Sequence, residues 1–207
     1  MANRTVRRKR KARKRIGRIA TSIAADAIGP LAPDEDIFVL SDGSFSLIDA
    51  LQHCIDWIGP CSVDIATWSA TATDIVRLDM LRKEGIIDPL RLIIDPSFFT
   101  RKTGNTNLLV NTFGSDIMRT IPSHAKVNVL RNGSWDLVLR TTANLNQNRR
   151  TEFFEVGHDP DLADLLTTFF DDVFARSPDT NFRDRTTGAL DVLFDGGPLD
   201  FDNMLKF

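Results

Sequence analysis

A histidine and a lysine two residues apart, His124 and Lys126, are the residues of this sequence best suited to chemistry. Residues i and i+2 of a β-strand point to the same face, so we predict a strand here on which the two side chains project together. An imidazole can act as a nucleophile, and an ammonium group can stabilise an oxyanion. The pair therefore predicts a site that holds a phosphate.

A third polar group, the amide of Asn144, follows after a predicted hairpin. Asn132-Gly133 is a strong two-residue turn signal between the apolar run that begins at Val127 and a return strand over 135–139. The polar residues beyond the return strand form a loop. We expect this loop to bring the amide to the point where the imidazole and the ammonium group meet.

This pattern resembles the signature of the phospholipase D superfamily, which is His-x-Lys, four residues, Asp, six residues and Gly-Ser-x-Asn. His124, Lys126 and Asn144 match the signature. Thr142 stands where the family has Ser, and Glu155 matches a Glu that the family often uses to orient the His. The pattern is most similar to that of single-motif phage and prophage members. The resemblance implies that the three matching residues and Glu155 are catalytic.

The sequence departs from the signature on the substrate side of the site. Arg131 stands where the Asp is expected, and Thr141 replaces the Gly. The gap that precedes Thr141 is nine residues rather than six. A side chain at the Gly position narrows the approach of a substrate, so these departures bear on whether cleavage is retained. We name Arg131, Thr141 and Thr142 as candidate substrate-binding residues.

Charge is divided unevenly along the chain. The 207 residues include 26 Lys and Arg and 28 Asp and Glu, a formal net charge of −2. Ten of the basic residues lie within 1–18, which hold no acid, so the rest of the chain has 16 basic and 28 acidic residues and a net charge of −12. We predict that 1–18 form a disordered arm that contacts the phosphates of nucleic acid, the alternative being a solubilising tail. The predicted contacts are Arg7, Arg8, Lys9, Arg10, Lys11, Arg13, Lys14 and Arg15.

The pattern over 19–176 predicts one α/β domain. Two apolar runs, 62–68 and 90–94, are typical of strands, and the helical spacing between them implies parallel strands with a right-handed crossover. Further helices are expected over 16–28, 47–58 and 106–113 and from 160 to 176, and further strands over 37–40 and 117–121. This order is also that of the superfamily's half-domain, so the resemblance implies a mixed, largely parallel central sheet flanked by helices.

The remaining features concern the C-terminal segment, the membrane, metal ions and the cellular compartment. Residues 177–207 are predicted to be an acidic C-terminal tail, either flexible or docked on a partner. No run has the length of a membrane span or of a signal peptide, so membrane insertion is not expected. The two cysteines make no metal cluster, and neither a metal nor a cofactor is expected. We expect a cytoplasmic protein, which the resemblance places in a phage or prophage context within the host cell.

The resemblance implies a metal-independent nuclease. Superfamily enzymes use two motifs, and single-motif members pair two chains. One His-x-Lys motif therefore implies a homodimer with both copies of His124 at a two-fold axis and a phosphohistidine intermediate. The alternative hypothesis is a catalytically degenerate phage protein that binds nucleic acid without cutting it. Two weaker hypotheses are a phospholipase, since no apolar membrane-binding segment accompanies the motif, and an interaction protein whose basic arm binds an acidic protein.

Overall fold

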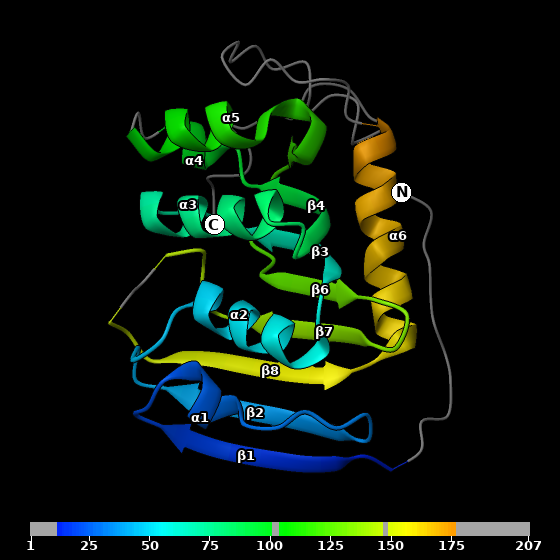
Figure 1. Cartoon of the computed structure of the whole chain (residues 1–207). Coiled ribbons are helices and arrows are strands. Elements are labelled where there is room, and N and C mark those ends of the chain that lie inside the picture. Colours follow the sequence, from blue (N-terminus) through cyan, green and yellow to red (C-terminus); the bar gives the residue numbers. More distant parts are fainter. Residues whose placement is uncertain (1–11, 101–103, 147–148, 177–207) are drawn as a thin grey trace, which may run out of the picture.

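A computed structural model describes residues 12–100, 104–146 and 149–176, built around one eight-stranded sheet in the order β1-β2-β8-β7-β6-β3-β4-β5 (Figure 1). The strands are β1 (Lys14–Ala20), β2 (Glu35–Ser41), β3 (Cys61–Thr67), β4 (Ile87–Ile94), β5 (Met118–Thr120), β6 (Val127–Arg131), β7 (Asp136–Thr141) and β8 (Glu152–His158). The helices are α1 (Ala24–Ile28), α2 (Leu47–Ile58), α3 (Ala72–Lys83), α4 (Ser97–Thr100), α5 (Gly104–Ile117) and α6 (Pro160–Arg176).

The sheet is mixed, as expected. Strand β1 pairs with β2, β3 with β4, and β4 with β5 in parallel, whereas the four pairs in the middle of the sheet are antiparallel. Strands β8 and β6 therefore run against all the others. We call the edge where β2, β7, β3 and β4 end the carboxyl edge, and the opposite edge the amino edge. Strands β8 and β6 begin at the carboxyl edge.

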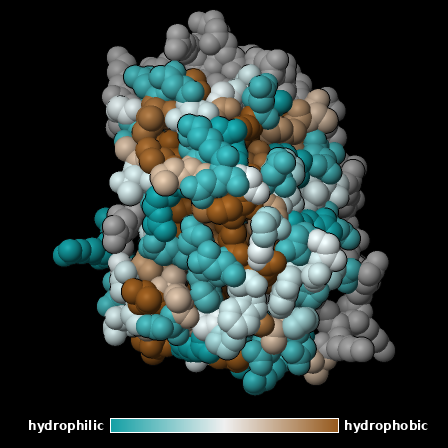
Figure 2. All heavy atoms as spheres, viewed as in Figure 1, coloured by the Kyte–Doolittle hydropathy of each residue, from teal (hydrophilic) through white to brown (hydrophobic). Residues whose placement is uncertain are grey.

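Helices cover both faces of the sheet. Helices α1 to α5 lie on one face, and α6 crosses the other (Figure 1). Strand β3 is buried on both sides: Val63 and Ile65 belong to the larger core cluster under α1 to α5, and Ala66 packs with Phe170 and Val173 of α6. On the face seen in Figure 2, hydrophilic residues cover much of the surface, and hydrophobic atoms emerge in patches between them. None of the helices within the described residues is long and apolar enough to cross a membrane.

Local sequence signals account for helices α2 and α6. At the start of α2, the Ser46 hydroxyl accepts the Asp49 N–H (3.3 Å) and the Asp49 carboxylate accepts the Ser46 N–H (2.8 Å), a reciprocal cap. Gly59 ends this helix with φ 84°, a conformation that favours glycine. The Asp159 carboxylate caps α6 by accepting the Leu162 N–H at 3.2 Å. Both helices confirm the sequence-based predictions.

The predicted helix over 16–28 is wrong in its first half. Residues 14–20 form strand β1, and only residues 24–28 are helical. The burial of β1 alternates: Ile16 packs against the core and Ala20 is buried, whereas Gly17 and Ile19 are exposed. The isoleucine spacing also fits a helix, but pairing with β2 across the whole strand decides the outcome.

Candidate active site at the carboxyl edge

His124 and Lys126 lie together at the carboxyl edge, although not within a strand. Strand β6 begins one residue later, at Val127, because the Ser123 hydroxyl accepts the Ala125 N–H (3.1 Å) and holds the preceding segment in a local turn. The Lys126 Nζ nevertheless lies 3.5 Å from both ring nitrogens of His124 and donates to its carbonyl oxygen at 3.1 Å. The imidazole is exposed, whereas Lys126 is 9% exposed.

The ammonium group of Lys126 is poised to take an anion. Burial lowers the pKa of Lys126, and the negative charge of Glu152 partly opposes this shift. Glu152 begins β8 at the same edge, where its carboxylate accepts the Thr142 hydroxyl. Among the described residues no carboxylate forms an ion pair with Lys126. A phosphate placed here would contact an ammonium group that folding has already largely removed from water.

The amide of Asn144 is oriented by the end of β3. Its Oδ1 accepts the backbone N–H of Trp68 at 3.1 Å, and the next residue, Leu145, donates its N–H to the Thr67 hydroxyl at 3.2 Å. Because a backbone N–H can only donate, the amide oxygen must face Trp68, and the Nδ2 donors are directed away from it. Within the described chain, Nδ2 donates to no protein group, so it can donate to a ligand oxygen.

Asp95, at the end of β4, fixes the segment that carries His124. One carboxylate oxygen accepts the Ser123 N–H at 2.9 Å, and the other accepts the Ser97 N–H at 2.8 Å. The Ser97 hydroxyl in turn accepts the indole N–H of Trp68 at 2.8 Å. Asp95 therefore supports the segment before His124 directly and, through Ser97, the side chain of Trp68.

The structure does not bring Glu155 to His124. Glu155 lies three residues into β8, about 10 Å beyond the strand's first residue. It stands opposite Arg140 in β7, and the two side chains form an ion pair. The carboxylate at the site is that of Glu152. The prediction of Glu155 relied on its spacing from Asn144. That spacing includes the loop before β8, and the sequence does not reveal the path of this loop.

Arg131 also lies away from the site. It ends β6 at the amino edge, roughly 16 Å along the strand from Lys126. Its guanidinium bonds the carboxylates of Asp136 at 2.6 Å and Asp164 at 2.9 Å. A substrate-binding role for Arg131 therefore conflicts with its position, because the strand carries it across the sheet and two carboxylates occupy it.

Thr141 and Thr142 do reach the carboxyl edge. The Thr141 hydroxyl donates to the Phe153 carbonyl at 2.7 Å and accepts the Ala143 N–H at 2.9 Å, so it shapes the loop rather than facing a ligand. The backbone N–H of Thr141 donates to the Lys126 carbonyl at 3.1 Å, which joins this loop to the His124 segment. Thr142 is exposed beside Glu152.

The predicted basic arm ends earlier than expected. Residues 1–11, with the basic cluster from Arg7 to Lys11, lie outside the described residues. Arg13 is tied to the fold: its guanidinium donates to the carbonyls of Glu35 (2.7 Å) and His158 (2.5 Å) and pairs with Asp36 at 2.8 Å. Lys14 pairs with Glu35 at 2.6 Å, and Arg15 is exposed on β1. Strand pairing thus converts the end of the predicted arm into part of the sheet.

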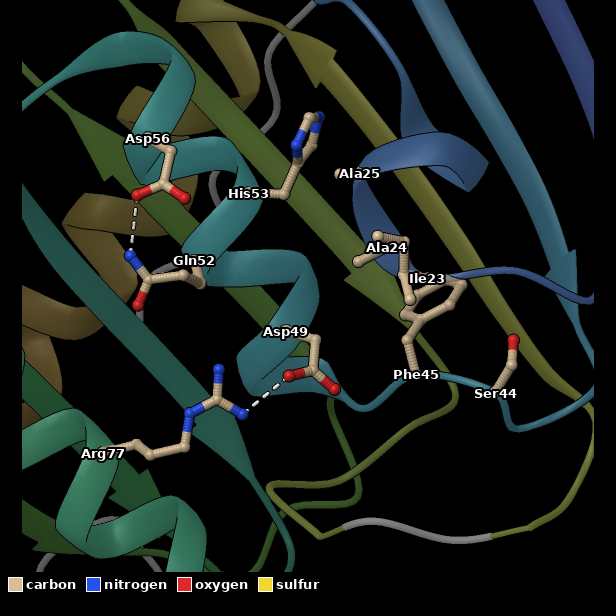
Figure 3. A pocket seen from close by; sticks show the side chains of 10 residues that line it. All are labelled: Ile23, Ala24, Ala25, Ser44, Phe45, Asp49, Gln52, His53, Asp56 and Arg77. Atoms are coloured by element: carbon tan, nitrogen blue, oxygen red, sulfur yellow. Dashed lines mark hydrogen bonds and ion pairs between the residues drawn. The ribbon is translucent and has the colours of Figure 1, made fainter.

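A separate hollow of about 290 Å³ lies beside α1, α2 and α3 (Figure 3). Its polar side chains are paired with protein groups: Arg77 with Asp49 at 2.6 Å and Gln52 with Asp56 at 2.8 Å. His53, which also lines it, bonds the Gly29 carbonyl at 2.8 Å. Because these side chains bond to protein groups, we do not assign the active site to the hollow.

Two residues of the site were missed from the sequence, Glu152 and Trp68. Glu152 was hidden by the more prominent spacing to Glu155. Trp68 follows a strand that was predicted, and its place just beyond the carboxyl end of that strand is where α/β proteins often hold ligands. Within the described ranges, no group of three His, Cys, Asp or Glu side chains is arranged to hold a metal ion.

Comparison with known proteins gives matches in structure only. No protein-family model matches the sequence, and no curated protein matches it. Among solved structures, Nuc from Salmonella typhimurium, a phospholipase D family member, is 19% identical over 61% of this chain and 85% of its own, with a TM-score of 0.46. NucT from Helicobacter pylori is 16% identical over 68% of this chain and 95% of its own, with a TM-score of 0.45.

A third solved structure is similar in fold. Polyphosphate kinase from Porphyromonas gingivalis is 11% identical over 72% of this chain and 30% of its own, with a TM-score of 0.51. At such identities the likeness concerns the fold alone. The expected fold class, a mixed sheet flanked by helices, is confirmed by the strand order.

Proposed function

We propose that the chain is a phospholipase D-like phosphodiesterase that cleaves nucleic acid without a metal ion and acts as a homodimer. The observation that carries the proposal is the exposed imidazole of His124 within 3.5 Å of the ammonium group of the buried Lys126. The orientation of the Asn144 amide adds donors at the same edge. Together they supply a nucleophile and two oxyanion-binding groups.

The proposed reaction has two steps. A ring nitrogen of His124 attacks the phosphorus, an N–P bond forms, and the bond from phosphorus to one ester oxygen breaks while an acid protonates that oxygen. Water then attacks the phosphorus, the N–P bond breaks, and the group that acted as acid takes the proton from the water. Lys126 and Asn144 stabilise the negative charge of the non-bridging oxygens in both steps.

The acid that protonates the leaving oxygen is proposed to come from a second copy of the chain. The chain has three histidines, and the other two are engaged elsewhere: His53 bonds the Gly29 carbonyl, and the ring of His158 accepts the Asp136 N–H at the amino edge. His124 is exposed, so a symmetry-related His124 can approach it. We also propose, from the sequence resemblance alone, a phage or prophage protein in the host cytoplasm.

The basic residues within 1–11 are proposed to add affinity for nucleic acid by contacting phosphates. A chain lacking these residues should bind DNA with a shallower dependence on salt concentration. Measuring the dissociation constant across a series of salt concentrations tests this. An unchanged slope would exclude the segment from binding.

Cleavage in the presence of EDTA tests the proposed activity. Wild type should cut plasmid or single-stranded DNA, and His124→Ala should not, whereas the matched control His53→Ala should cut like wild type. Cutting by His124→Ala would place the activity elsewhere. Light scattering tests the dimer: a monomer in solution would contradict the shared site.

Mixed dimers sharpen this test. If each site needs both copies of His124, co-refolding wild type with His124→Ala should lower activity as the square of the wild-type fraction. A linear decline would mean that each chain carries a complete site.

A second candidate function, nucleic-acid binding without cleavage, is favoured by two departures from the family's pattern. Thr141 adds a side chain where the family has Gly, and Glu155 is paired with Arg140. If wild type and His124→Ala both bind DNA and neither cuts it, this second function replaces the first.

A further inference from the structure

Each tryptophan of the chain lies beside one histidine. The chain has three of each. The ring centroids lie 6.4 Å apart for Trp57 and His53, 6.3 Å for Trp68 and His124, and 5.5 Å for Trp135 and His158. Only the second pair belongs to the candidate active site, so the other two pairs serve as internal controls for any role of an indole beside an imidazole.

Trp68 is held in place by bonds at both ends. Its indole N–H donates to the Ser97 hydroxyl at 2.8 Å, and its backbone N–H donates to the Asn144 amide at 3.1 Å. Asp95 in turn supports Ser97 and the residue before His124. The half-buried ring thus has an orientation fixed relative to the imidazole, at an interplanar angle of 51°.

Phosphate binding does not require this ring. A phosphate is recognised by cations and hydrogen-bond donors, which Lys126, Asn144 and His124 already provide. A large indole beside an exposed imidazole instead suits a planar group that accompanies the phosphate. In a nucleotide, the base lies one sugar away from the phosphate, and bases stack on aromatic side chains in proteins that bind single strands.

We propose that Trp68 stacks against a nucleobase next to the phosphate held at His124 and Lys126, which makes single-stranded nucleic acid the preferred substrate class. A base in a duplex is already stacked between its neighbours and must be unstacked before it can reach the ring. The inference rests on the proposed function, because it assumes that the site holds the phosphate of a nucleic acid.

The experiment compares three labelled probes of equal length by fluorescence anisotropy: oligo(dT), an abasic oligomer with the same backbone, and a duplex. All proteins carry His124→Asn to prevent cleavage. The protein with Trp68 intact should bind oligo(dT) more tightly than the abasic oligomer and the duplex. Adding Trp68→Leu should weaken oligo(dT) binding by about 5- to 100-fold and leave abasic binding unchanged. Trp68→Phe should restore part of the difference.

The matched control is Trp57→Leu, which removes the exposed indole that lies beside His53 on α2. It should leave all three affinities unchanged. If Trp68→Leu weakens oligo(dT) and abasic binding equally, Trp68 only positions the site and the inference fails. It also fails if the ratio of the two affinities does not change, or if the parent protein binds neither oligomer.

Cleavage assays with otherwise unchanged protein separate this failure from that of the proposed function. If the chain cuts no phosphodiester yet prefers oligo(dT) through Trp68, the proposed activity is wrong and the stacking inference stands. If it cuts oligo(dT) and the abasic oligomer at equal rates with or without Trp68, the activity stands and the stacking inference is overturned.

Discussion

At the amino edge of the sheet, Arg131 and Arg13 are matched by carboxylates, whereas Lys126 at the carboxyl edge is matched by none in the part of the chain that the structure describes. Burial alone would lower the pKa of Arg131, but Asp136 and Asp164 outweigh it and raise the pKa. Burial lowers the pKa of Lys126 despite Glu152. Arg131 and Arg13 are therefore neutralised by protein carboxylates as part of the fold, whereas within the described residues Lys126 is not.

Removing one cation from each edge should give the largest difference in cleavage rate. We expect Lys126→Met to lower the cleavage rate by about 100-fold or more, because one group that stabilises the charged oxygens is lost. Arg131→Met should leave the rate within about twofold of wild type and lower the free energy of unfolding by about 1 kcal/mol, a value limited by the partial exposure of its ion pairs. Rate measurements and urea unfolding of both variants check this. Equal rates for the two variants would remove Lys126 from the site.

Arg13 offers the next largest effect, on stability. Replacing it with Met leaves Asp36 and three carbonyl groups without this donor, so we expect the free energy of unfolding to fall by about 2 kcal/mol. A methyl group at Gly157 would also disturb this arrangement, because its Cβ would press against the Asp36 Oδ1. The exposed neighbour provides the control: Arg15→Ser should leave unfolding unchanged. Similar losses in both variants would mean that the bonds of Arg13 add no stability.

The two glutamates of β8 extend the comparison to acids. We expect Glu152→Gln to lower the cleavage rate by about tenfold. The negative charge of Glu152 raises the pKa of Lys126 and so helps to keep its ammonium group protonated, and the Gln variant lacks that charge. Glu155→Gln should change the rate by less than about twofold, because only its surface pair with Arg140 is lost. Steady-state rates at a fixed pH decide between them. The opposite ranking would restore Glu155 as the partner of His124.

The smallest expected effect is the pH dependence from His158 at the amino edge. Burial lowers the pKa of His158, whose Nδ1 accepts the Asp136 N–H at 3.0 Å. The unfolded chain takes up a proton near pH 6.5 while the folded chain does not, so this contribution to stability is complete above pH 6.5 and is lost as the pH falls through the folded pKa. His158→Asn keeps an acceptor and removes the titration, so its unfolding free energy should depend less on pH below 6.5. Urea unfolding at several pH values measures this. The same pH dependence of the unfolding free energy in both proteins would contradict it.

Local patterns in the sequence predicted much of the fold. The cap at Ser46 and the apolar spacing of α2 and α6 determine helices from nearby residues alone. Strand β1 was missed because its basic residues and isoleucines fit more than one local structure, and only the partner strand β2 selects one. The hairpin was predicted, but β6 ends at Arg131 and β7 begins at Asp136, so the connection has four residues instead of two.

The candidate site was predictable where its residues are neighbours in sequence. His124 and Lys126 meet because only one residue separates them in the segment that leads into β6. Glu152 and Trp68 reach them through the pairing order of β8, β6 and β3, which no spacing records. Arg131 was misplaced for the same reason, since a continuous strand carries it to the other edge of the sheet.

Both cysteines of the chain lie inside the larger core cluster, and this burial has a practical consequence. It raises the pKa of Cys54 to about 12 and that of Cys61 to about 11. Because only the thiolate attacks alkylating reagents, the native protein should resist labelling at neutral pH. The labelling rate of the wild type then measures how often the core opens. A cysteine placed on the surface would react alone and could carry a fluorophore or spin label without background.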